Sequence, residues 1–183
     1  MTITMEKSEI TPVKQIAAVL YQSEAELEKA YTLMAKRFSG IDFKGEFFPF
    51  VESDYYGPEM GSGLMRGIIS FEQLVDPGTL AASKLLARNL ENQLRSEGGR
   101  TVNIDIGFLD MFKIVLASFK SRSNKIYLSD GVWADWLMYF EGGDFKTFLW
   151  SFPDFKSGIY DTALKSIRNR YKSQLKEERQ PKD

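Results

Sequence analysis

The amino-acid sequence predicts an α+β fold, and three observations lead to that class. Strand and helix patterns alternate over residues 13–106, strand patterns dominate residues 125–150, and an amphipathic helix pattern follows. The 183 residues are 43% hydrophobic and 14% aromatic, which is typical of a folded chain and excludes general disorder. We expect one domain over residues 1–183, with flexible ends at 1–11 and 177–183.

The first two elements have clear local signals. Residues 13–21 form a short run rich in branched apolar side chains, which is typical of a buried strand. Ser23 precedes Glu24 and Glu26, a pattern that indicates a helix start with the Ser hydroxyl as cap and the acids near the positive helix end. Apolar residues then recur at spacings of three and four, which predicts a helix to about Phe38.

The next elements complete a repeated pattern. Residues 43–51 and 64–71 predict two strands, and Pro49 indicates that the first lies at a sheet edge or contains a bulge. Asp76-Pro77 marks a helix start, because Asp caps free amides and Pro needs no N–H in the first turn. The apolar stripe of that helix consists of Leu80, Ser83, Leu86, Leu90 and Leu94. Residues 102–106 then alternate apolar and polar side chains, as a half-buried strand does.

This order of strand, helix, strand, strand, helix and strand is the split βαβ pattern of ferredoxin-like domains. We therefore expect a ferredoxin-like βαββαβ core extended by a β-meander over residues 126–150, with a C-terminal amphipathic helix over residues 160–175. The alternative is a mixed α/β sheet with another strand order. Residues 110–120 are apolar nearly all round, and we favour a short helix capped by Asp110 over a strand.

Several chemistries are excluded by composition. The chain contains no His and no Cys, so Ser-His triads, thiol catalysis, disulfides and imidazole or thiolate metal sites are impossible. No cofactor is evident, and a metal would have to be Mg²⁺ or Ca²⁺ held by oxygen ligands. The net charge of −1 argues against nucleic-acid binding. Apolar runs are too short to span a bilayer and no secretion signal is present, so we expect a cytoplasmic protein without a membrane partner.

One candidate ligand site is the loop over residues 54–61. Asp54, Tyr55 and Glu59 lie in a Gly-Pro segment between two strands, where acids and phenols could bind a cation or a polar ligand. A local turn bond by Asp54, with the tyrosines covering the edge of the core, explains the same residues. The glycines of this region do not form the Gly-x-x-x-x-Gly-Lys string of a phosphate-binding loop.

The second candidate site lies on the strand over residues 102–106. Asn103 and Asp105 share one face, and an ionised carboxylate there needs a partner. Lys84, Lys113 and Lys120 are the candidate partners. A Lys–Asp site could position a phosphate or carboxylate ligand, whereas a structural ion pair would explain the same residues. A small basic cluster that could receive an anion follows, consisting of Lys120, Arg122 and Lys125.

A set of short strings occurs in order along residues 12–155. The strings are Pro12-Val13-Lys14, Phe48-Pro49-Phe50, Asp54-Tyr55-Tyr56, Glu59-Met60-Gly61, Ser70-Phe71, Val75-Asp76-Pro77, Lys84-Leu85, Asn89-Leu90-Glu91, Val102-Asn103-Ile104-Asp105 with Gly107, Val115-Leu116-Ala117 with Lys120, Ile126-Tyr127-Leu128, and Trp150 with Pro153-Asp154. Together they resemble a family of small bacterial proteins without an established activity, domain of unknown function 4416. Members of that family are sometimes labelled GTP-binding proteins, although this chain contains no phosphate-loop or guanine-specifying motif.

The chain departs from that family pattern in two places. The family tends to have a His-Arg pair where this chain has Asn124 and Lys125, and Pro where it has Ile106. An amide cannot replace a titrating imidazole, so either this position only forms hydrogen bonds or this member has lost an activity. The leading hypothesis is a protein, or an enzyme of unknown reaction, that binds a small polar or phosphorylated ligand. The alternative is a non-catalytic interaction domain or homodimer.

Overall fold

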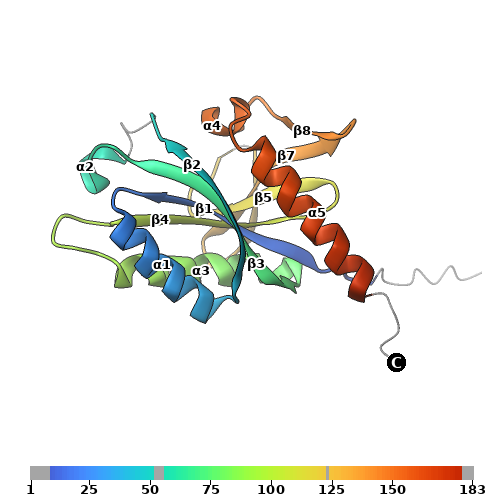
Figure 1. Cartoon of the computed structure of the whole chain (residues 1–183), viewed down its shortest axis with the longest axis horizontal. Helices are drawn as coiled ribbons and strands as arrows, with labels where there is room; N and C mark the ends of the chain where they lie inside the picture. Colours follow the sequence, from blue (N-terminus) through green and yellow to red (C-terminus); the bar gives the residue numbers. More distant parts are fainter. Residues whose placement is uncertain (1–8, 52–55, 123, 179–183) are drawn as a thin grey trace, which may run out of the picture.

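An eight-stranded antiparallel sheet forms the centre of the computed structural model, which describes residues 9–51, 56–122 and 124–178 (Figure 1). The order is β2-β3-β1-β4-β5-β7-β6, and β8 also pairs with β7. Each neighbouring pair is antiparallel. The strands are β1 (Val13–Tyr21), β2 (Ile41–Pro49), β3 (Met65–Val75), β4 (Val102–Leu109), β5 (Lys113–Ser118), β6 (Lys125–Ser129), β7 (Val132–Glu141) and β8 (Asp144–Thr147).

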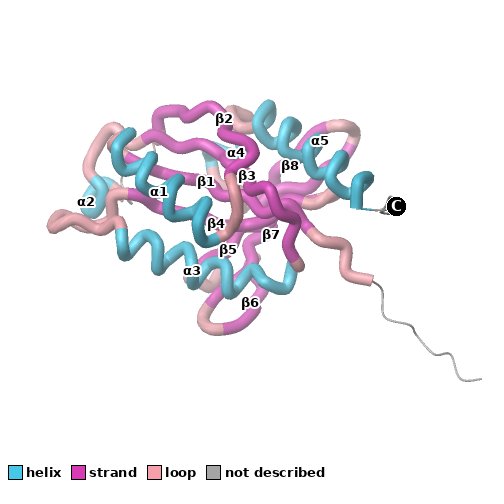
Figure 2. Tube along the Cα trace, turned by 60° about the horizontal axis from the view of Figure 1, so that its bottom comes forward, coloured by secondary structure: helices cyan, strands magenta, loops and turns pink. Residues whose placement is uncertain are grey.

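Helices cover both faces of the sheet. Helices α1 (Glu24–Arg37) and α3 (Leu80–Gln93) lie side by side on one face, as Figure 2 shows. Helix α5 (Asp161–Glu178) and the short α4 (Pro153–Lys156) cover the other face. A short α2 (Gly57–Met60) and the 3₁₀ helix η1 (Pro77–Thr79) complete the described helices. In the described part of the chain, no helix is long and apolar enough to cross a membrane.

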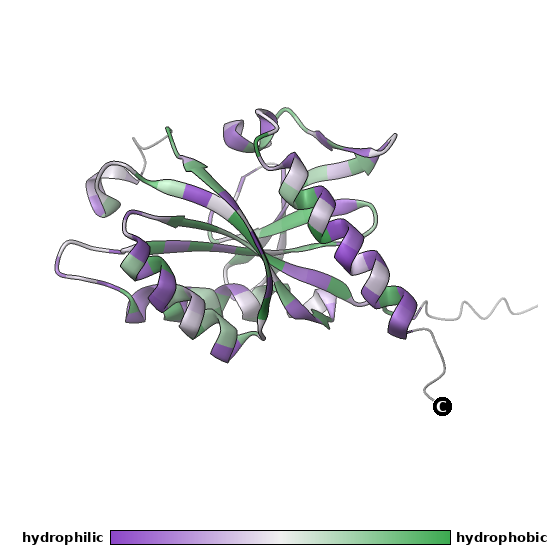
Figure 3. Ribbon diagram, viewed as in Figure 1, coloured by the Kyte–Doolittle hydropathy of each residue, from purple (hydrophilic) through white to green (hydrophobic). Residues whose placement is uncertain are grey.

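Strand β1 separates two hydrophobic clusters because its side chains alternate between the faces. Ala17 and Val19 pack with α1 and α3, whereas Ile16 and Ala18 pack with α4 and α5. All nine residues of β1 are buried, including the polar Lys14 and Gln15, because both faces of this strand are covered. In Figure 3 the strands are largely hydrophobic, whereas α1 and α5 show both hydrophobic and hydrophilic residues. The three-layer arrangement therefore follows from one fully covered central strand.

Most expected elements in the first half are confirmed. Strand β2 lies at an edge of the sheet, and its pairing with β3 has two register shifts, as Pro49 indicated. The expected hydroxyl cap of α1 is wrong. Ser23 accepts hydrogen bonds through its carbonyl oxygen, and its side chain makes no cap bond. The helix nevertheless begins at Glu24, because its buried face packs on the sheet regardless of the cap.

The expected apolar stripe of α3 is only partly correct. Leu80, Ser83, Leu90 and Leu94 are buried, but Leu86 is only half-buried. Two charged residues, Lys84 and Glu91, are buried on this helix instead. Burial of charged side chains is costly unless they find partners, so their environment marks an unusual part of the fold.

Two expectations for the second half are corrected. Residues 113–118 are strand β5, and Asp110 forms the turn before it by accepting from the amides of Phe112 and Lys113 at 2.7 and 2.8 Å. Both a helix cap and a tight turn use this carboxylate–amide bond, so the local signal did not distinguish them. The extension is also not a simple β-meander. Strand β5 pairs with β7, while β6 pairs with the first half of β7 and β8 with its second half.

Asp76 caps the segment leading into α3, because its carboxylate accepts from the Gly78 amide at 2.7 Å. We expect Asp76→Ala to lower the free energy of unfolding by about 1 kcal/mol, since the amide loses its acceptor. Asp76→Asn keeps an acceptor oxygen and should retain most of the stability. Urea melts of the three proteins measure the difference, and equal stability of Asp76→Ala and the wild type would show that the cap contributes nothing.

Candidate functional site

A cleft opens where β4 and β5 separate. These strands pair only over residues 107–109 of β4, and the cavity beside the unpaired part has a volume of about 700 Å³. Gly107 lies at the point of separation, where a Cβ would lie 2.3 Å from the carbonyl oxygen of Val115. The absence of a side chain therefore allows the close crossing from which the strands diverge.

Side chains of α3 replace the missing strand along the open edge of β4. The Ile104 amide donates to Glu91 at 2.6 Å, and Lys84 Nζ donates to the Ile104 carbonyl oxygen at 3.1 Å. Buried peptide groups need partners, and these two bonds meet that need without β5. Burial raises the pKa of Glu91, against the opposing effects of Lys84 and the Ile104 amide. Lys84 and Glu91 are therefore buried because they complete the edge of the sheet.

Asp105 links the two faces of the sheet at the floor of the cleft. Its carboxylate accepts from Arg66 at 2.9 Å and from Lys84 at 3.4 Å. Arg66 also donates to Asp154 at 2.9 Å, so the cluster joins β3, β4, α3 and α4. Burial acts to raise the pKa of Asp105, but the attraction of Lys84 and Arg66 outweighs it and lowers that pKa. Two cations therefore hold Asp105 ionised.

Arg100 closes the end of the cleft nearest α2. Its guanidinium contacts both carboxylate oxygens of Glu59 at 2.9 and 2.7 Å, and it donates to Asn103 Oδ1 at 2.9 Å. The hydrogen bonds from Arg100 lower the pKa of Glu59. The Asn103 amide favours the ionised form of Asp105, although its buried Nδ2 forms no hydrogen bond of normal geometry within the described chain.

The opposite wall comes from β5, β7 and the segment before β6. Asp135 accepts from Asn124 at 3.1 Å and pairs with Lys125 at 3.1 Å, and Lys125 also donates to Ser118 at 2.9 Å. Asn124 and Lys125, the pair at which we expected a departure from the family pattern, both line the cleft. Asn124 acts as a hydrogen-bond donor in this wall, which either interpretation of that departure allows.

Cations outnumber acids in the lining of the cleft. Among the described residues the cavity has four acids, and each has an ionic partner in the structure. The acids are Glu59, Glu91, Asp105 and Asp135. The described cations of the lining number seven, namely Lys84, Arg88, Arg95, Arg100, Lys120, Arg122 and Lys125. The described lining residues therefore have an excess of three positive charges, although the whole chain has a net charge of −1.

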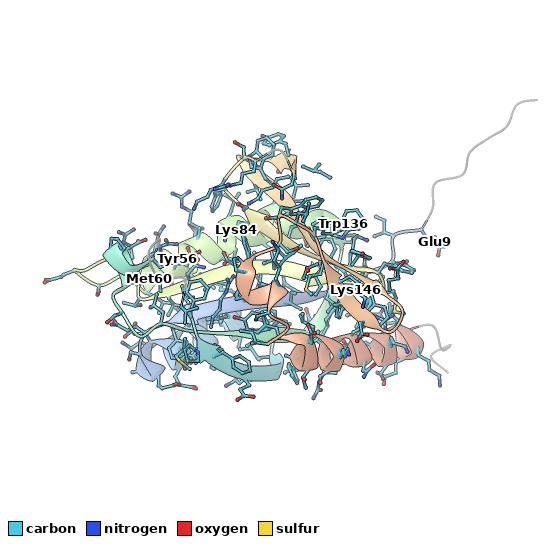
Figure 4. All side chains as sticks on the ribbon, turned by 90° about the horizontal axis from the view of Figure 1, so that it is seen from above. Glu9, Tyr56, Met60, Lys84, Trp136 and Lys146 are labelled. Carbon is cyan, nitrogen blue, oxygen red and sulfur yellow. The ribbon has the colours of Figure 1, made fainter. Side chains whose placement is uncertain are left out.

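The structure brings five of the seven candidate site residues together. These residues line the one cleft, namely Glu59, Lys84, Asn103, Asp105 and Lys120. Asp54 and Tyr55 lie outside the described residues. Of the proposed partners of Asp105, Lys84 makes the ion pair, whereas Lys113 pairs with Asp110 elsewhere. In Figure 4, Lys84 lies between Tyr56 and Trp136 in projection.

Several residues of the cleft were missed by the sequence analysis. Arg88 and Glu91 on α3, and Arg95 just after its end, follow the candidate Lys84 at spacings of four, three and four. That spacing places the three residues of α3 on one helix face, so a charged stripe was visible in the sequence. Arg66 and Arg100 carried no comparable local signal, because their partners are distant in the chain. Among the described residues no group of three acids could hold a metal ion.

The Asp105 ion pairs predict a measurable effect on stability. We expect Asp105→Asn to lower the free energy of unfolding by about 3 to 5 kcal/mol at neutral pH, because Arg66 and Lys84 lose their carboxylate. Asp144→Asn is a matched control, because Asp144 pairs with Lys165 on the surface and its loss should change little. Urea melts of both variants measure the difference.

The same variant predicts a pH dependence. The pKa of Asp105 is lowered in the folded protein, so its stabilising effect is present above the unfolded pKa of about 3.9 and is lost as the pH falls through the folded pKa. The gap between wild type and Asp105→Asn should therefore narrow below about pH 4. A gap that stays constant down to acid unfolding would contradict the assigned ionisation.

Comparison with known proteins supports the resemblance noted in the sequence. A family model described as a domain of unknown function, DUF4416, matches residues 11–171. Comparison with curated proteins and with solved structures found no match. The match spans both sides of the cleft, including α3, β4, β5 and β7. The chain therefore belongs to the DUF4416 family.

Proposed function

We propose that the cleft between β4 and β5 binds a small anionic ligand, of the phosphorylated or carboxylate-bearing class. The observation that carries this proposal is the excess of three positive charges among the described lining residues. Cations that line a concave, partly desolvated surface attract anions more strongly than the same cations on an open surface. A volume of about 700 Å³ lies within the range of small-molecule sites.

Three arginines are placed to contact such a ligand. Arg88, Arg95 and Arg122 are exposed in the cleft, and none of them has an ion pair with another described residue. Arg88 packs over the ring of Phe119 at 4.9 Å, which restricts its side chain. Guanidinium groups bind phosphate and carboxylate oxygens in a two-point geometry, so this set suits an anion recognised by side chains instead of a phosphate loop.

An enzyme built on this cleft would depend on Glu91 for proton transfer. Its side chain is 5% exposed, and its pKa is raised by burial, which brings its titration closer to neutral pH. Its Oε1 atom accepts from the Ile104 amide and its Oε2 atom pairs with Arg100 at 3.6 Å, so proton transfer to a ligand would require Oε2 to exchange this ion pair for the ligand. Binding of the anion is the proposal, and proton transfer by Glu91 is the chemistry that it would permit.

Pyrophosphate, inorganic phosphate and citrate are the probes for this proposal. We expect one or more of them to raise the unfolding temperature, with about 2.7 kcal/mol of stabilisation at one hundred times the dissociation constant. Calorimetric titration should show about tenfold weaker binding for Arg88→Ala and for Arg122→Ala, since each loses charge-assisted hydrogen bonds.

Arg37→Ala is the matched control, because Arg37 is exposed at the end of α1 and does not line the cleft. It should bind the probes as the wild type does. Absence of binding by every anion, or an equal loss in Arg37→Ala, would contradict the proposed site.

A second candidate function is self-association through β6, which would make the protein a homodimer. This strand is the last in the order of the sheet, and Ile126 and Tyr127 are 67% and 55% exposed on it. An apolar edge strand can pair with another strand, and an added Lys blocks such pairing. Sedimentation equilibrium should then show a dimer that Ile126→Lys abolishes, whereas a monomer at every concentration would contradict this candidate.

A second inference concerns the fold around the cleft. We infer that β1 to β4 with α1 and α3 correspond to a ferredoxin-like core. The order β2-β3-β1-β4 and the position of both helices on one face support this assignment. In this description the proposed site lies at the outer edge of the core, where β4 separates from β5, the first of the strands that extend the core.

A further inference from the structure

An aromatic stack lies at one rim of the cleft. Phe148 and Trp150 stack in parallel, with ring centroids 4.5 Å apart and an angle of 6° between the planes. Trp136 and Tyr139 contact the same Phe148 ring at 5.2 and 5.1 Å. Trp150 lines the cleft and is 44% exposed. Since Phe148 covers one face of the Trp150 indole, the exposed surface must come from its other face and its edge.

Hydrogen bonds hold this indole in place. Trp150 Nε1 donates to the Trp136 carbonyl oxygen at 2.9 Å. The turn that carries Trp150 is tied to β7, because Ser151 Oγ donates to the Leu137 carbonyl oxygen at 2.5 Å and accepts from the Phe148 amide at 2.8 Å. The ring is therefore ordered before any ligand arrives, which reduces the entropy lost on binding.

The rim and the α3 wall offer complementary chemistry to one ligand. Trp150 and Phe152 contribute aromatic surface to the same cavity that Arg88, Arg95 and Arg122 line with positive charge. A simple inorganic anion would use only the arginines. A molecule that carries both a flat ring and an anionic group would use both surfaces, since an aromatic face offers a stacking platform.

We propose that the ligand of the cleft carries a planar aromatic or heteroaromatic ring next to its anionic group, and that Trp150 stacks on this ring. This inference rests on the proposed function, because the arginines must hold the anion for the ring to reach Trp150. It narrows the ligand class from small anions to ring-bearing anions, such as aryl phosphate esters. Trp150 is then a residue that determines specificity, whereas the arginines supply most of the attraction.

Three phosphate monoesters with rings of increasing size test the inference, namely methyl, phenyl and 1-naphthyl phosphate. We expect calorimetric titration of the wild type to give tighter binding in that order. Phenyl phosphate should bind about tenfold tighter than methyl phosphate, which corresponds to about 1.4 kcal/mol. That difference lies within the range measured for ring stacking on aromatic side chains.

Trp150→Leu keeps apolar bulk but removes the stacking surface. It should bind methyl phosphate as the wild type does and lose most of the preference for the two aryl esters. Trp150→Phe should restore part of that preference. Trp133→Leu is the matched control, because Trp133 contacts Tyr127 and does not line the cleft. It should retain the full preference.

The outcomes separate the two proposals. Equal binding of all three esters by the wild type would overturn the ring inference and leave anion binding intact. An undiminished aryl preference in Trp150→Leu would overturn the role of Trp150. Failure of all three esters, of phosphate, of pyrophosphate and of citrate would overturn the proposed function and this inference together. The inference is supported if Trp150→Leu loses the aryl preference while its binding of methyl phosphate is unchanged and Trp133→Leu keeps the preference.

Discussion

The ion pairs of Asp105 are the interaction on which the rest of the cleft depends. One carboxylate contacts Lys84 on α3 and Arg66 on β3, and Arg66 extends the network to Asp154 on α4. Helices α3 and α4 lie on opposite faces of the sheet, so the network fixes their positions around the open edge of β4. A buried cation without its partner would be costly, so the charges have to be kept together or removed together.

The open edge of β4 also constrains the structure of the cleft. A strand that separates from its neighbour exposes peptide groups, and these groups must bond to water, to a new strand or to side chains. Here Glu91 and Lys84 bond to both peptide groups of Ile104, so the edge is satisfied while β5 remains apart. The same two side chains therefore stabilise the fold and keep the cavity open. Their charges also give the floor of the cavity its polar character.

The candidate site was predictable from the sequence to the extent that its signals are local. Alternation in β4 placed Asn103 and Asp105 on one face, and the structure brings both into the cleft with Lys84. The charged spacing on α3 was also a readable signal. Arg66 and Arg100 were not predictable, because their partners lie 39 and 41 residues away and meet only when the sheet forms. Trp150 was not predictable as a residue of the cleft either, because its exposure depends on a turn that Ser151 holds against β7.

Strand β1, helices α1 and α3, and strand β4 followed from sequence patterns, because periodicity and chain punctuation act over a few neighbouring residues. The strand at residues 113–118 was not predicted, because the tertiary contacts of a short apolar segment decide whether it forms a strand or a helix. Tertiary structure alone decided that β5 pairs with β7 and that β4 separates from β5 on one side of Gly107. It also decided that seven cations and four acids of the described residues meet in one cavity. Those outcomes depend on contacts between distant segments, which form only when the whole sheet buries its two faces.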